Sequence, residues 1–329
     1  MAWWVWYSEP GISVIQNENA IMRHKVIIQR ARSPDSGFRA QIEDLLLGRL
    51  LANHSLKGKH VLLKPNLLKA GEPMAVTSPG MILAVSRALK VGGANVLLAD
   101  SPAFGRAIQV IKGLGIRDEL EDIGVEVRSL GHARKVDVGE GIAVGVSRTA
   151  LDADLIVNLP RLKAHSQMGI TCAVKNLYGT VVGFRKACYH VLHGGSRERF
   201  SGMILGLMDV LPKCVTILDA ICAMHVTGPS GGEPIEMNFI AGSCSPVALD
   251  TAVYVMVGAL PRDAPLWQVA MDRGVSGAWL EEIEFPELLP HDIPEGRMFR
   301  LPQALAPIRF SPTRFVKGRA RSFFRHFKQ

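Results

Sequence analysis

Short apolar runs alternate with longer amphipathic stretches through the middle of the chain. The runs "HVLL", "NVLLA" and "LIV" begin at residues 60, 95 and 155, and polar residues follow each of them. Short apolar runs of this kind, bounded by turn residues, are typical of buried strands. The stretch "TSPGMILAVSRALKVGG" instead has the signals of a helix, with Ser78 as N-cap, Pro79 in the first turn and Gly92 at the end. The pattern predicts alternating strands and helices.

The same alternation continues on both sides of this region. "MRHKVIIQRA", "VEVRSL", "VTILDA" and "MNFIAGS" are predicted strands, and "FGRAIQVIKGLG" and "SPVALDTAVYVMVGAL" are predicted helices, the second capped by Ser245. Short apolar strands separated by capped helices indicate an α/β fold. We therefore expect a mainly parallel sheet with helices on both faces, in a single large domain.

The ends of the chain differ in character from this middle part. Residues 1–22 precede the first predicted strand and form an N-terminal extension. Residues 23–280 make up the α/β domain. From about Glu281, repeated prolines break every helical pattern, so residues 281–329 are predicted to be an irregular Pro-rich segment followed by a basic C-terminal tail.

The positive charge of the chain is concentrated in this tail. Of a net charge of +8 over 329 residues, residues 309–329 supply seven Lys or Arg and no acid, so the remainder is nearly neutral. A global charge of this size suggests a nucleic-acid-binding protein, but its location argues against specific nucleic-acid binding. Val316, Ala320, Phe323 and Phe327 fall on one helical face of the tail, a pattern typical of a basic amphipathic helix on an anionic membrane surface. The alternative is a disordered, solvated end or one that binds nucleic acid nonspecifically.

Several classes of site are excluded by spacing. The five cysteines form no CxxC pair and no ferredoxin-type run, so no intrinsic iron–sulfur cluster is expected. Neither a P-loop nor a GxGxxG motif after a strand occurs, and no GxSxG elbow is present. Scattered cysteines suit a reducing compartment, and no apolar stretch reaches transmembrane length. The expected location is cytoplasmic, with peripheral attachment to a membrane through the tail.

Polar clusters follow four of the predicted strands. Lys64-Pro65-Asn66, Asp100-Ser101-Pro102, Asn158 to His165, and Asp219 each stand at the carboxyl end of an apolar run. Ligands of open parallel sheets bind beyond these strand ends. Taken one by one, such clusters are ordinary helix caps or turns. Together they predict a shared cleft.

The third cluster opens an unusual acid-free stretch. Between residues 155 and 197 there is no Asp or Glu, but six Lys or Arg and three His. Lys163 and His165 are two apart and face the same way on an extended chain. "MGITCAVKNLYG" is predicted to be a helix that places Lys175 and Asn176 near its end. Cations without local carboxylates need an external anion, or carboxylates from distant segments; a solvated surface loop is the alternative.

The order and spacing of several motifs resemble the DUF362 family. The motifs are "KPNLL", "VTSP", "ADSP", "NLPRLKAHSQMGITCAVKNLYG", "ILDAICAMHVTGPSGGEP" and "AGSCSPVALDTAVYVMVG", and they cover roughly Lys25 to Gly258. Matching positions are Lys64, Asn66, Asp100, Ser101, Lys163, His165, Lys175, Asn176 and Gly179. The sequence departs from the family pattern at Ala164, His225 and Ser245.

The resemblance implies chemistry that the residues alone do not. Many members carry a ferredoxin module, which this chain lacks, so electrons would come from a separate ferredoxin-type donor. The family is also distantly similar to nickel-pincer lactate racemases, which implies a metal or nucleotide-type cofactor, although the cofactor itself stays unknown.

We therefore expect an enzyme that acts on an anionic small molecule, by a redox reaction or by metal-assisted proton transfer. The expected catalytic residues are His165, Lys175 and Lys163, with His165 as acid/base or metal ligand. Lys64, Asn66, Asp100, Ser101 and Asn176 are expected to bind the substrate. The rival reading is a non-catalytic cofactor carrier or a membrane-peripheral binding protein.

Overall fold

The strands of the protein lie in two sheets of the computed structural model, which describes residues 23–31, 37–103, 105–183 and 185–308. Within these residues the strands are β1 (His24–Arg30), β2 (His60–Pro65), β3 (Asn95–Asp100), β4 (Glu126–Ser129), β5 (Ala133–Asp137), β6 (Ala143–Ser147), β7 (Leu155–Leu159), β8 (Arg161–His165), β9 (Gly169–Thr171), β10 (Cys214–His225), β11 (Glu233–Ser243) and β12 (Ile283–Glu284).

Helices connect most of these strands. The α-helices are α1 (Phe38–Glu43), α2 (Pro79–Val91), α3 (Ala107–Gly113), α4 (Arg117–Asp122), α5 (Arg148–Leu151), α6 (Ala173–Leu177), α7 (Arg185–His193), α8 (Arg197–Leu205), α9 (Leu207–Val210), α10 (Pro246–Met256) and α11 (Pro265–Asp272). A π-helical segment, η1 (Asp44–Leu50), continues α1. Short 3-10 turns are η2 (Pro73–Ala75), η3 (Tyr178–Thr180), η4 (Pro261–Asp263), η5 (Leu280–Glu282), η6 (Pro290–Asp292) and η7 (Pro294–Met298).

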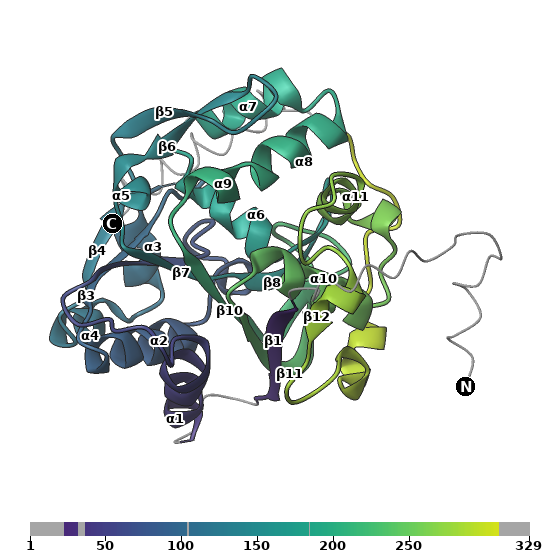
Figure 1. Cartoon of the computed structure of the whole chain (residues 1–329). Helices are drawn as coiled ribbons and strands as arrows, with labels where there is room; N and C mark the ends of the chain where they lie inside the picture. Colours follow the sequence, from purple (N-terminus) through teal and green to yellow (C-terminus); the bar gives the residue numbers. More distant parts are fainter. Residues whose placement is uncertain (1–22, 32–36, 104, 184, 309–329) are drawn as a thin grey trace.

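The main sheet has a parallel centre and one antiparallel side. Its strand order is β12-β1-β11-β10-β7-β2-β3-β4, and β8 and β9 extend it beyond β10. Pairing is parallel from β10 through β7, β2 and β3 to β4, whereas β11 is antiparallel to both β10 and β1. β5 and β6 form a separate hairpin (Figure 1). The prediction of a mainly parallel α/β sheet is confirmed.

Both faces of the sheet are buried, as parallel sheets require. Along β2, Val61 and Leu63 belong to one apolar cluster with helices α1 to α4, and Leu62 belongs to another with α6, α8 and α9. Ile156 of β7 also joins the second cluster. Figure 1 shows α1, α2 and α4 below the sheet and α6, α8 and α9 above it. The helices on both faces are therefore as predicted.

A long strand carries the site segment past the edge of the parallel centre. β10 continues after its pairing with β7 ends, and β8 runs parallel to this extension, with Asp219 opposite Arg161 and Met224 opposite Lys163. β9 then folds back antiparallel on β8. The helix predicted for "MGITCAVKNLYG" is wrong in its first part, because Gly169–Thr171 pairs as a strand; the helix begins only at Ala173.

The segment after residue 280 is mostly short turns, but it also adds strand β12 beside β1. It then crosses the β8–β9 hairpin, where Ala306 N donates to Ser166 O at 2.7 Å and Gln167 Nε2 donates to Pro307 O at 2.9 Å. The predicted N-terminal extension and the basic tail lie outside the described residues. Within the described residues no helix has the length and apolar character needed to cross a bilayer.

Candidate functional site

The carboxyl ends of β2 and β3 hold a buried ion pair. Lys64 Nζ lies 2.9 Å from Asp100 Oδ1, and the Lys64 side chain is fully buried. The second oxygen of Asp100 accepts a hydrogen bond from Leu67 N at 2.9 Å. Neighbouring parallel strands end at the same edge of the sheet, so residues 36 apart in sequence meet there.

Two asparagines connect this ion pair to β8. Asn66 Nδ2 donates to Asn176 Oδ1 at 3.0 Å, and Asn66 Oδ1 accepts from Lys163 Nζ, also at 3.0 Å. Lys64 Nζ reaches the same Asn176 oxygen at 3.4 Å. A side-chain amide both donates and accepts, which lets it join two ammonium groups without adding charge. Lys64, Asn66, Asp100, Lys163 and Asn176 thus form one hydrogen-bonded network, as the strand-end clusters predicted.

Hydrogen bonds to β7 and α10 hold helix α6 in place. Asn176 Nδ2 donates to Asn158 Oδ1 at 2.8 Å, which ties the helix to β7. The carboxylate of Asp250 on α10 accepts from Ala173 N at 2.6 Å and Val174 N at 3.1 Å, so it caps the first turn. Burial raises the pKa of Asp250 to about 7. Sequence reasoning missed Asp250; the signal was an aspartate in an otherwise apolar helix.

One cation of the acid-free stretch is neutralised by a distant carboxylate. Arg161 Nη1 lies 2.7 Å from Asp219 Oδ2, and both side chains are buried. The same oxygen accepts from Ser78 N at 2.8 Å, at the start of α2. Asp219 therefore both neutralises Arg161 and accepts a hydrogen bond at the start of α2.

Lys163 and Lys175 have no such carboxylate among the described residues. Lys163 Nζ donates to Asn66 Oδ1 and to Ala75 O at 2.8 Å, both neutral acceptors. Lys175 Nζ lies 4.5 Å from the centre of the Tyr178 ring, a cation–π contact. Burial first, then Arg161 and Lys175, lower the pKa of Lys163 to about 7. Burial, with Lys186 and Lys64, lowers that of Lys175 to about 7.

His165 is held as a neutral hydrogen-bond donor. Its Nδ1 accepts hydrogen bonds from Gln167 N at 3.1 Å and Met168 N at 3.3 Å. A nitrogen that accepts carries no proton, so the neutral ring has its proton on Nε2. Burial and the positive charges of Lys175 and Lys163 hold the pKa of His165 well below its usual range. Ligation of a metal through Nε2 needs the opposite tautomer, which these two N–H groups oppose.

A third lysine approaches the site from α7. Lys186 Nζ donates to the main-chain oxygen of Ser101, and burial lowers the pKa of Lys186 to about 8. Ser101 Oγ accepts from Gly183 N at 3.2 Å, so Ser101 contacts the start of α7 rather than the amide network. The sequence interpretation counted Lys186 among the cations but did not assign it to the site. Its position in the acid-free stretch was the available signal.

At Gly179 the backbone passes close to the ion pair of Lys64 and Asp100. A Cβ at this position would lie 2.4 Å from both Asp100 Oδ1 and Lys64 Nζ. Only glycine leaves room for the pair here, which explains the residue that ends "KNLYG".

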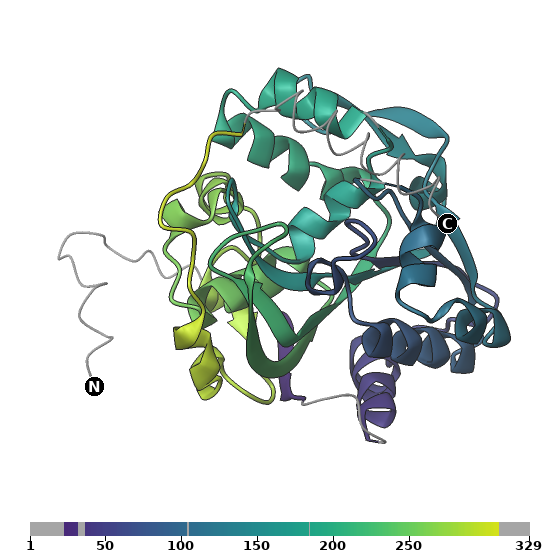
Figure 2. The same ribbon diagram turned by 180° about the vertical axis from the view of Figure 1, so that it is seen from behind.

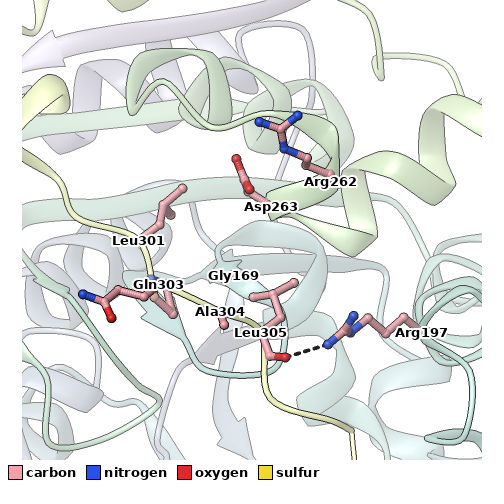
Figure 3. Close-up of a pocket in the computed structure, with 9 residues that line it drawn as sticks. Gly169, Arg197, Arg262, Asp263, Leu301, Gln303, Ala304 and Leu305 are labelled. Carbon is pink, nitrogen blue, oxygen red and sulfur yellow. Dashed lines mark hydrogen bonds between the residues drawn. The ribbon is translucent and has the colours of Figure 1, made fainter.

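Two pockets bounded by described residues lie away from Lys64, Lys163 and Lys175. One, of about 440 Å³, is lined by residues at the other ends of β2 and β3, including His60 and Asn95. The other, of about 260 Å³, is lined by Arg197, Arg262 and residues 301–305, and Figure 3 shows Gly169 at its wall. Gly169 is the pairing partner of His165. The cleft predicted around Lys64, Lys163 and Lys175 stays a prediction.

The described residues contain no group of three or more His, Cys, Asp or Glu arranged to hold a metal ion. Donors at the strand ends are instead ammonium, amide and imidazole N–H groups. This donor set suits an anion and does not suit a metal cation.

Comparison with known proteins places this chain among relatives of unassigned reaction. Residues 61–255 match the family described as "Domain of unknown function (DUF362)". A thylakoid-associated protein of Synechocystis is 32% identical over 312 residues, covering 93% of this chain and 95% of the relative.

Two solved structures show a weak likeness to this chain. The lactate racemase apoprotein of Thermoanaerobacterium thermosaccharolyticum has a TM-score of 0.44 and 13% identity, covering 70% of this chain and 56% of that one. A protein of Thermotoga maritima has a TM-score of 0.38 and 14% identity, covering 63% and 55%. This chain therefore spans just over half of either structure, and the TM-scores are too low to transfer a site or a reaction.

Proposed function

This chain belongs to the DUF362 family, and from that premise and the strand-end geometry we propose that it binds an anionic small molecule between Lys163, Lys175 and His165. The observation that carries the proposal is the difference between the buried cations. Lys64 and Arg161 each have a carboxylate partner, Asp100 and Asp219. Lys163 and Lys175 have neutral partners only, among the described residues.

An anion would supply the missing counter-charge. Within the described residues Lys175 Nζ makes no hydrogen bond, so its donors are available to a ligand beside the Tyr178 ring. The protonated Nε2 of His165 adds a neutral donor. The pKa of the lysine that contacts the anion would rise on binding, because an opposite charge favours the ammonium form, and the other lysine would stay able to accept a proton. A carboxylate, a phosphate or an enolate oxygen has the required charge.

The same groups support proton transfer on the bound anion. A lysine with a pKa of about 7 is part amine and part ammonium at neutral pH, which suits a general acid/base. His165 would stabilise negative charge on a substrate oxygen through Nε2–H rather than remove a proton. We propose proton abstraction next to a carboxylate, with Lys163 or Lys175 as the base. Lys64, Asn66, Asp100 and Asn176 position these groups.

Cofactor chemistry enters this proposal only through the family resemblance. Because Nδ1 of His165 accepts two backbone hydrogen bonds, the ring does not fit a metal site at Nε2, and we derive no step through a metal or a metal-bearing nucleotide. A reaction that draws electrons from a separate ferredoxin-type partner likewise rests only on the family resemblance.

Binding of inorganic phosphate and of oxalate, measured by isothermal titration calorimetry, tests the anion site. Lys175→Met should weaken binding at least tenfold, whereas Lys112→Met, an exposed lysine on α3, should leave it unchanged. Equal affinities in the two variants would contradict the proposal. Loss of the Cα–H signal from 2-hydroxy acids in D₂O, followed by NMR, then separates an enzyme from a cofactor carrier.

A peripheral membrane role is the second candidate. Residues 309–329 carry seven Lys or Arg and no acid, and the Synechocystis relative is named as thylakoid-associated. Each cation near an anionic bilayer adds about 1 kcal/mol of attraction. Removal of residues 309–329 should therefore lower sedimentation with phosphatidylserine vesicles and leave phosphate binding intact. Equal sedimentation of the two proteins would contradict a membrane role for the tail.

A further inference from the structure

Helix α7 buries Ala187 but exposes two aliphatic side chains. Val191 and Leu192 have exposed fractions of 62% and 68%, the largest among the exposed apolar side chains of the described residues. Toward the interior the helix turns Lys186, which donates to Ser101 O, and His190, whose ring centre lies 4.5 Å from that of Phe200. A surface helix ordinarily buries its apolar stripe.

The proposed anion site accounts for the polar side chains that α7 turns inward, but not for the aliphatic ones that it exposes. Lys186 and His190 lie beside the proposed anion site, because Tyr178 contacts Lys175, His190 and the main-chain oxygen of Lys186. Nothing in that site requires the two most exposed positions to be aliphatic. Val191 and Leu192 are adjacent and form a small apolar patch, the feature that interaction surfaces enlarge upon.

The charge around the exposed pair is positive. Arg185 begins α7 and is exposed, and Arg197 and Arg199 are exposed at the start of α8. Glu198 stands between the latter two and keeps its negative charge, so these four side chains carry a net charge of +2. Aliphatic side chains accompanied by arginines complement a surface that is apolar inside and anionic outside.

The described part of the chain ends beside the α7–α8 connection. Ile308, the last described residue, packs so closely on Gly194 that a Cβ there would lie 2.1 Å from Ile308 O. Arg197 Nη2 holds the preceding turn through Leu305 O at 2.7 Å. Figures 1 and 2 both show the yellow C-terminal segment rising toward the α7–α8 region. Twenty-one further residues, with seven cations among them, follow Ile308 in the sequence.

From these relationships we propose that the outer face of α7 docks on an anionic lipid bilayer, with Val191 and Leu192 entering the interface and Arg185, Arg197 and Arg199 contacting headgroups. Docking in this way orients the body so that the helix covering the lysine site faces the membrane. The proposal shares the bilayer with the tail proposal but is independent of the anion site.

Sedimentation with vesicles of equal parts phosphatidylserine and phosphatidylcholine tests the docking face. The test compares full-length protein, the double variant Val191→Ser with Leu192→Ser, and the control Val91→Ser, a 59% exposed valine at the end of α2. Serine keeps the charge unchanged, so only the apolar contribution is lost. The double variant should bind about tenfold to a hundredfold more weakly, since each lost aliphatic contact amounts to about tenfold. The control should bind as the unaltered protein does.

Salt separates this face from the tail. At about 1 M salt the Debye length falls to about 3 Å, so binding through the tail weakens most and the difference between double variant and control persists. Thermal unfolding of the double variant confirms that it is folded. Equal binding of variant and control at both salt concentrations would overturn the proposal. So would a change from dimer to monomer, seen by light scattering, with vesicle binding unaltered, because the face would then join two copies of the chain.

Discussion

Asn66 donates its side-chain amide to Asn176 at 3.0 Å, and this single contact links the lysine of β8 to the ion pair at the ends of β2 and β3. Without it, Lys163 and Lys64 would be two buried cations with separate partners. The amide pair makes them one network with a common geometry, so a change at Asn66 is expected to reach both.

Asn66→Ala should lower the free energy of unfolding by about 1–3 kcal/mol, because Lys163 Nζ and Asn176 Oδ1 each lose a partner away from water. Urea denaturation measures this change. Asn95→Ala, which removes one exposed hydrogen bond to Gly58 O, is the matched control and should change stability by less than about 0.5 kcal/mol. Similar losses in both variants would mean that the network is not cooperative.

Asp219→Asn should destabilise the protein by about 3–5 kcal/mol. It leaves the buried Arg161 guanidinium without its carboxylate and weakens the hydrogen bond to Ser78 N at the start of α2. The comparison is Glu119→Gln, which breaks the half-exposed pair with Arg87 and should cost less than about 1 kcal/mol. Thermal and urea unfolding of the two variants supply the values, and a cost for Asp219→Asn no larger than that of Glu119→Gln would refute this account of the pair.

Gly179→Ala should disrupt the Lys64–Asp100 pair, since the new methyl group would sit 2.4 Å from both charged atoms. We expect a loss of about 2–4 kcal/mol in unfolding free energy together with weaker phosphate binding. Gly195→Ala places its methyl group in open space and should change neither quantity. An alanine at residue 179 that is tolerated as well as the one at 195 would show that the pair can move aside.

The stability of the protein should rise with pH because of Lys163. Its pKa is about 7 in the folded chain and 10.5 ordinarily, so between these values the unfolded chain holds more protons. Stability therefore increases as pH rises above about 7 and is lowest below it, where the buried ammonium is charged. Relative to Lys163→Met, the unaltered protein should gain about 1 kcal/mol per pH unit between pH 7 and 10. Lys112→Met should run parallel to the unaltered protein, and parallel curves for Lys163→Met would exclude the shifted pKa.

All five cysteines are free thiols in the structure, in agreement with the prediction from their spacing. Thiol titration of unreduced, denatured protein should count five. In the native protein the exposed Cys244 should react with a disulfide reagent first and Cys172 last, because burial raises the pKa of Cys172 well above its usual range. A fast-reacting Cys172 would show that the α6 region opens readily.

The strand ends were predictable because parallel strands place their carboxyl ends together, whatever lies between them in sequence. That rule brought Lys64, Asn66, Asp100 and the segment from Asn158 to His165 to one edge. The β9 strand was not predictable from "MGIT", since four apolar or small residues suit either periodicity and only pairing with β8 decides.

The tautomer of His165 depends on a tight turn that no local pattern indicates. Gln167 N and Met168 N point at Nδ1 only because β8 ends and β9 turns back within three residues. In the same way, the role of Asp250 depends on α10 lying under the first turn of α6. These contacts are set by tertiary packing, so the sequence indicates the residue types and the fold assigns their function.

The first strand of the chain has consequences for how the protein is made. β1 sits between β11 and β12, with Ile28 opposite Ala241 and His24 opposite Ile283. On the ribosome, this apolar strand emerges before both of its neighbours, which follow only after roughly two hundred further residues. "KVIIQ" therefore spends most of translation with unpaired edges, a state that invites aggregation and chaperone binding. β1 gains its second neighbour only after β12 has been synthesised.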